Sequence, residues 1–140
     1  MSVQTSVSIK EASNDLQKEI SEWIHDSELL EISLPTPDSK ELKLKFRSGK
    51  GDEHRLKFSN VLALSCSSIS TQNVVFEMNF LVGQDAVDEL SIIFSDINAL
   101  YSAKLIDSLV RGDLRFVQIQ PSVGAQFSII FEKLSSETYL

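Results

Sequence analysis

The residues best suited to metal or acid–base chemistry lie in one short run near the N-terminus, W-I-H-D-S-E, which begins at Trp23. His25, Asp26 and Glu28 could ligate a metal ion together with His54, the second of the two histidines. Catalytic metal sites usually take three protein ligands. Nothing in the spacing of these four residues brings them together, so the sequence predicts no metal site and no cofactor.

A structural role is the alternative for the same run. The hydrophobic pattern changes from a helical period to strict alternation at Asp26, which predicts a corner between a helix and a strand. Polar side chains at such a corner bond exposed backbone groups. We therefore expect His25, Asp26 and Glu28 to satisfy the corner and Trp23 to fix the helix on the sheet.

Other catalytic signatures are incomplete. Metal-dependent phosphohydrolases with an adjacent His-Asp pair need several further histidines, and this chain has one more. Cys66 would be a nucleophile only with a histidine beside it, and its apolar surroundings, L-A-L-S-C, favour a buried thiol. G-K-G at residues 49–51 lacks the spacing of a phosphate-binding loop. We predict that the chain is not an enzyme.

Five basic side chains are expected on one exposed face of a hairpin. Alternating hydrophobic residues on both sides of the S-G-K-G-D turn predict two paired strands. The basic residues between them point away from the core: Lys43, Lys45, Arg47, Arg55 and Lys57. This face could dock an anionic or protein partner. The alternative is that the lysines protect an exposed edge from aggregation.

Composition limits the partners and the compartment. The 140 residues carry a net charge of −7, with the positive excess confined to residues 39–57, so nucleic acid should be repelled. The basic hairpin also lacks the interleaved aromatic residues that stack single-stranded bases. One cysteine, no apolar run of membrane-spanning length and no basic-then-apolar start predict a cytoplasmic protein that does not enter a membrane.

The order of elements predicts an α+β domain over residues 1–140, with residues 1–12 and 132–140 flexible. A mainly antiparallel sheet of about six to eight strands should carry two helices on one face. The first helix should begin at Ser13 or Asn14, and the second at Ser95 or Asp96 and end at Gly112. An acidic connection is expected at residues 83–89. Strands are predicted over residues 30–34, 42–47, 54–58, 61–66, 74–80, 90–94, 114–120 and 125–131.

Three segments carry a family resemblance: the run from Trp23 to Leu34, L-K-F-S-N-V-L-A-L at residues 56–64, and Q-N-V-V at residues 72–75. They resemble small bacterial proteins of the immunity-protein-50 type. In these, an H-D-[AS]-E strand precedes a charged hairpin, an F-x-x-V strand and a Q-N-V-I strand. The matching residues are Trp23, His25, Asp26, Glu28, Phe58, Val61, Gln72, Asn73 and Val74.

The resemblance implies a non-enzymatic inhibitor that neutralises a co-encoded toxin by binding it, and it supplies no catalytic residues. An acidic inhibitor would be steered toward a basic toxin. A secretion-chaperone-like adaptor for an effector protein is the alternative, although no helix is expected after Phe131. A small metal-dependent enzyme is the third. A homodimer is an open alternative to a monomer in each case.

Overall fold

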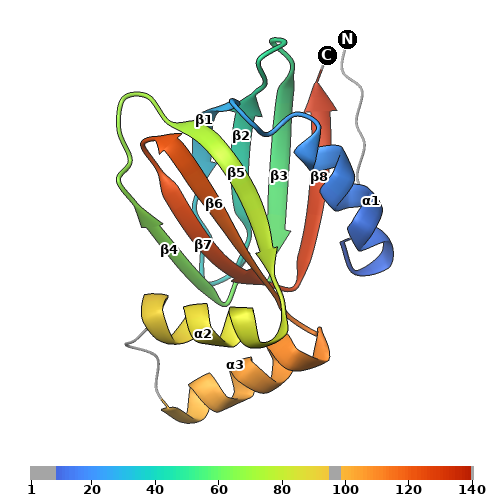
Figure 1. Cartoon of the computed structure of the whole chain (residues 1–140), viewed down its shortest axis with the longest axis vertical. Helices are drawn as coiled ribbons and strands as arrows, with labels where there is room; N and C mark the ends of the chain where they lie inside the picture. The colour runs from blue at the N-terminus through green and yellow to red at the C-terminus, as the bar shows by residue number, and fades with distance from the viewer. Residues whose placement is uncertain (1–8, 95–98, 140) are drawn as a thin grey trace.

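The computed structural model describes residues 9–94 and 99–139, which form three helices and one eight-stranded antiparallel sheet (Figure 1). The α+β class and the antiparallel sheet are therefore confirmed. In chain order the elements are α1 (Ile9–Ser21), β1 (Glu28–Ser33), β2 (Leu42–Arg47), β3 (Glu53–Ser59), β4 (Ala63–Ser67), β5 (Val74–Leu81), α2 (Gly83–Ile93), α3 (Ala99–Arg111), β6 (Arg115–Val123), β7 (Gln126–Phe131) and β8 (Lys133–Tyr139).

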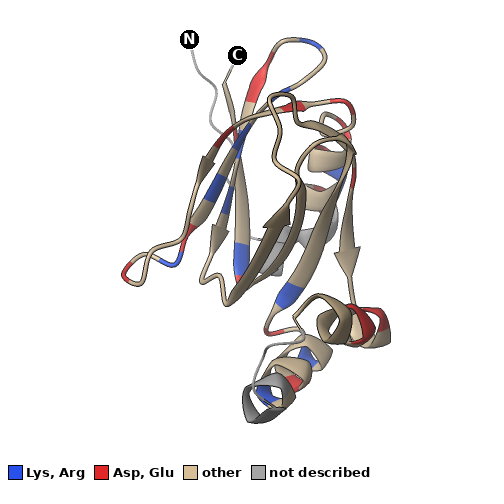
Figure 2. Ribbon diagram, turned by 90° about the vertical axis from the view of Figure 1, so that its left-hand side faces the viewer, with Lys and Arg blue, Asp and Glu red and all other residues tan. Residues whose placement is uncertain are grey.

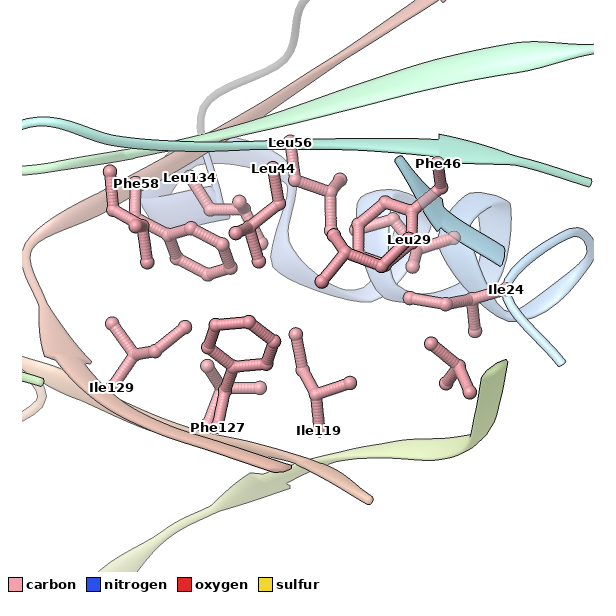
Figure 3. Packing of buried hydrophobic residues seen from close by; sticks show 14 of the residues in the cluster. Ile24, Leu29, Leu44, Phe46, Leu56, Phe58, Ile119, Phe127, Ile129 and Leu134 are labelled. Atoms are coloured by element: carbon pink, nitrogen blue, oxygen red, sulfur yellow. The ribbon is translucent and has the colours of Figure 1, made fainter. Parts of the chain in front are cut away.

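The sheet bends so that its two halves face each other (Figure 1). The strand order is β4-β7-β6-β5-β1-β2-β3-β8, and the single register pair that links β5 to β1 is Glu28 with Val74. Figure 3 shows side chains of β2 and β3 pointing toward those of β6 and β7. Phe58 meets Phe131 edge-on across this gap, with ring centroids 4.9 Å apart. The main hydrophobic core therefore lies inside the bend.

Helix α1 belongs to this inner core. Leu16, Ile20 and Ile24 are buried in it, so the predicted apolar stripe is confirmed. The helix begins at Ile9, earlier than predicted, and the expectation of a flexible arm is wrong for residues 9–12. The segment K-E-A contains good helix formers that extend the first turn. The part of the predicted arm at residues 1–8 lies outside the described residues.

Helix α2 replaces the predicted acidic connection and the predicted strand at residues 90–94. Ala86 and Leu90 are four residues apart and both buried, which is helical spacing. The apparent alternation through Ile92 was misleading, because that side chain is 72% exposed. None of the helices in the described ranges is long and apolar enough to cross a membrane.

Helices α2 and α3 pack together on the outer face of the sheet. Leu90 and Leu105 form a second hydrophobic cluster with Phe116 and Ile130. Residues next to Phe116 and Ile130 along β6 and β7 belong to the inner core, so this cluster lies on the opposite face of the sheet. Gly112, at φ +81°, ends α3 as predicted. The predicted cap at residues 95–96 lies outside the described residues.

Strand β8 contradicts the expectation that residues 132–140 are flexible. It pairs with β3 along its whole length, from Lys133 with Ser59 to Tyr139 with Glu53. Leu134 is 1% exposed, and Ser136 is equally buried. A polar sequence with a single inward leucine gives little strand signal, so main-chain pairing and topology decide its structure. Residue 140 lies outside the described residues.

We expect Leu134→Ala to lower the free energy of unfolding by about 2–4 kcal/mol, because it removes a fully buried leucine. Lys133→Ala, on the exposed side of the same strand, should change it by less than about 0.5 kcal/mol. Urea unfolding measures both. Equal and small effects would contradict the assignment of β8 to the core.

Candidate functional site

The corner after α1 joins the two halves of the sheet. The Asp26 N–H donates to the Val75 carbonyl at 2.9 Å, and the Val75 N–H donates to the Ser27 carbonyl at 2.9 Å. The Leu29 N–H donates to the Asn73 carbonyl at 2.8 Å. Asp26 takes a left-handed conformation, φ +63°, which Asp tolerates better than most residues. The H-D-S-E motif therefore lies at the corner between a helix and a strand, as its sequence pattern predicted.

The three polar side chains of the corner have different partners. His25 Nδ1–H donates to the Phe76 carbonyl at 2.6 Å, and its Nε2 lies 3.5 Å from Asp26 Oδ2. Glu28 instead accepts from Arg47, at 3.0 Å. Among the residues that the structure describes, no three His, Cys, Asp or Glu side chains are placed to hold a metal ion.

Trp23 fixes the end of α1 against strands β2 and β3. Its indole stacks flat on the His54 ring, with centroids 4.0 Å apart and an interplanar angle of 3°, and lies 5.7 Å from the Phe46 ring. His54 is 6% exposed, and its Nδ1 lies 3.0 Å from Thr138 Oγ1. Burial lowers the pKa of His54, and the nearby Asp52 opposes this only in part.

A groove of about 650 Å³ separates α1 from β5. Ile20 and Ile24 contribute from the helix side, and Met78 and Phe80 from the strand. After Val74, β5 pairs with β6 but with no described strand on its other side. Beyond Phe76, whose carbonyl accepts from His25, one edge of β5 therefore has no strand partner among the described residues.

Phe76 projects at one end of this groove and is 50% exposed. The sequence alternation grouped it with Met78 and Phe80, opposite Val75, but Val75 is the buried residue. Register shifts on both sides of Val75 rotate the strand locally. The sequence contains one sign of this irregularity, Pro121, which cannot donate to a ladder and which the structure places opposite Val75.

The five predicted basic residues do lie together on strands β2 and β3. Lys43 is opposite Lys57, and Lys45 is opposite Arg55. Acids of β1 and of β3 itself lie beside them, however, and Figure 2 shows both basic and acidic positions along the sheet. Lys45 pairs with Glu31 at 3.8 Å and with Glu53 at 3.3 Å.

Two lysines keep the basic character of this face. Arg47 pairs with Glu28, and Arg55 lies over the Tyr139 ring. Lys43 and Lys57 lie opposite each other at the end of the hairpin away from its turn. The surface is therefore mixed in charge, with acids beside Lys45 and Arg47.

Asn73 of the Q-N-V-V segment has a structural position. Its Oδ1 accepts from the Ser70 and Ala125 N–H groups, each at 2.9 Å. A Cβ on Gly124 would lie 2.3 Å from the same oxygen. Asn73 thus ties the β6–β7 turn to the start of β5, next to the bond from Leu29.

Cys66 lies half-buried on the outermost strand β4, opposite Phe127. Burial raises the pKa of its thiol, which keeps it protonated and weakens it as a nucleophile.

No family model, curated protein or solved structure matches this chain. The fold and the surface together define a single-sheet α+β protein with a groove beside an unpaired strand edge. Its membership of an immunity-protein family stays a prediction.

We expect the stability of the wild type to fall, relative to His54→Phe, as pH is lowered from 7.5 to 5.5. The unfolded chain takes up a proton on His54 near pH 6.5, while the folded chain resists it, so unfolding becomes easier below that pH. Burial and the charge of Glu22 raise the pKa of Glu19, so Glu19 stabilises the folded state as the pH falls. This contribution is the same in both proteins and cancels when their stabilities are compared. Urea unfolding at the two pH values measures the difference. Parallel changes in both proteins would show that His54 does not resist protonation.

Proposed function

We propose that this chain is a non-catalytic protein that binds another protein in the groove between α1 and β5. The observation that carries the proposal is the unpaired edge of β5 beside the exposed ring of Phe76. A strand edge with free N–H and C=O groups pairs readily with an extended segment of another chain. Such strand addition gains affinity from main-chain hydrogen bonds and specificity from pockets for alternate side chains.

The groove has both apolar and polar lining. On the helix side Ile20 and Ile24 line it with Gln17, Lys18 and Ser21, and on β5 Met78 and Phe80 line it with Glu77 and Asn79. The helix side is fixed in place, because both isoleucines are buried in the main core. A partner segment would therefore meet a preformed site.

A toxin is the partner class that we propose. Support comes from the resemblance to immunity proteins of the immunity-protein-50 type, whose matching residues His25, Asp26 and Asn73 surround the start of β5. The net charge of −7 favours encounter with a basic protein. For the secretion-chaperone alternative, residues after Phe131 form β8 where such adaptors would have a helix, so no observation favours it.

The mixed-charge face is a second proposed contact. Lys43 and Lys57 project side by side and could meet a local acidic patch on the partner. Their role would be in the rate of association, because exposed charges steer encounter more than they hold a complex.

We expect Phe76→Asp to abolish capture of a specific partner from an extract of the native cell, because a charge would replace the exposed aromatic ring at the end of the groove. Ile92→Asp is the matched control, since it places the same charge on another exposed hydrophobic residue, on α2. Mass spectrometry quantifies what co-purifies with each protein. Recovery of the same partners with Phe76→Asp as with the wild type would contradict the groove as the binding site.

For the captured partner, Lys43→Glu with Lys57→Glu should slow association severalfold and leave dissociation nearly unchanged, as is typical of charges at the rim of an interface. Added salt should slow association of the wild type and have less effect on the double variant. Stopped-flow or surface binding kinetics measures both rates. Identical association rates at low salt would leave edge protection as the role of these lysines.

A further inference from the structure

We propose that a second hollow, on the other side of the end of α1, binds the cationic group of an arginine or lysine side chain of the partner protein. The hollow has a volume of about 420 Å³. Glu19, Glu22 and Trp23 line it from the end of α1 and the turn after it, and Asp52 and His54 line it from the β2–β3 turn and β3. The inference rests on the proposed function in one respect, that the partner is a protein.

The charges around the hollow favour a cation. Three carboxylates line it, against one basic side chain, Lys50. Glu19 and Glu22 stand one helical turn apart, and their mutual repulsion contributes to the raised pKa of Glu19. A cation between them would stabilise both ionised carboxylates.

The wall of the hollow also holds a buried polar atom without a partner. His54 is 6% exposed, and its Nε2 has no hydrogen-bond partner in the described structure. When His54 donates through Nδ1 to Thr138, its Nε2 carries a lone pair that can accept a hydrogen bond. A guanidinium or ammonium group has N–H donors for the carboxylates, and it would reach this covered atom only after the side chains around it shift.

The stacked rings add a further attraction. Trp23 and His54 lie parallel at 4.0 Å, so each ring covers one face of the other, and both residues line the hollow. Cations bind favourably against the face of an indole, and a planar guanidinium stacks on it.

The position of the hollow favours a side chain from a bound protein. His25 lines both the groove and the hollow, so the two lie on either side of the corner. A protein with an extended segment on β5 therefore has the hollow within reach of a neighbouring basic residue. In the described residues no three metal-ligating side chains converge, which disfavours a metal ion as the occupant.

The test uses N-acetyl-argininamide as the probe and the fluorescence of Trp23, the single tryptophan, as the signal. We expect a saturable change with the arginine probe and none with N-acetyl-citrullinamide, which has a similar shape without the charge. Glu19→Gln with Glu22→Gln should weaken binding by about tenfold or more, the loss expected when charge-assisted hydrogen bonds are removed. The matched control is Asp38→Asn with Glu41→Gln, which makes the same change in net charge outside the hollow and should bind as the wild type does.

Three results would overturn the proposal: no saturable response of the wild type, an equal response to the citrulline probe, or unchanged binding by the Glu19 and Glu22 double variant. Circular dichroism checks that the variants fold. The outcome is separable from that of the groove, because the probe needs no partner. If the arginine probe binds but Phe76→Asp does not affect partner capture, the hollow is supported and the groove is contradicted. If Phe76→Asp abolishes capture but the arginine probe does not bind, only the hollow is contradicted.

Discussion

The rest of the structure depends on the main-chain hydrogen bonds between the corner after α1 and the start of β5. They join the two halves of the sheet over a few residues, from Asp26 to Leu29 on one side and from Asn73 to Val75 on the other. Because the halves are joined here and bend toward each other, the aromatic core is enclosed between them. Beyond Val75, β5 continues with β6 alone. The same junction that encloses the core therefore leaves the strand edge on which the proposed function rests.

Helix α1 has two roles at this junction. Its apolar stripe enters the core, and the indole of Trp23 stacks on His54 of β3, the strand next to β8. The end of the helix thereby lies between the groove beside β5 and the acidic hollow beside the β2–β3 turn. In this account the residues of the H-D-S-E motif hold the site in place, and the residues that would contact a partner flank them.

Elements with a clear period could be predicted from the sequence. The β2–β3 hairpin has clean alternation and a glycine turn, so both its strands and its outward basic residues were predicted correctly. Helix α2 was missed because an alternating run hid its helical spacing, and β8 because its sequence is polar. The carboxylates that neutralise Lys45 and Arg47 could not be predicted, since Glu31 and Glu28 reach them through strand order. The exposure of Phe76 follows from register shifts, which a one-strand pattern does not encode.

Hydrogen–deuterium exchange on the free protein and on its complex with the captured partner distinguishes strand addition at β5 from binding elsewhere. We expect amides on the unpaired edge of β5, within residues 76–81, to exchange readily in the free protein and to become protected in the complex. Protection should extend to the last turn of α1. Protection confined to β4 or α2, with exchange in β5 unchanged, would contradict binding by strand addition in this groove.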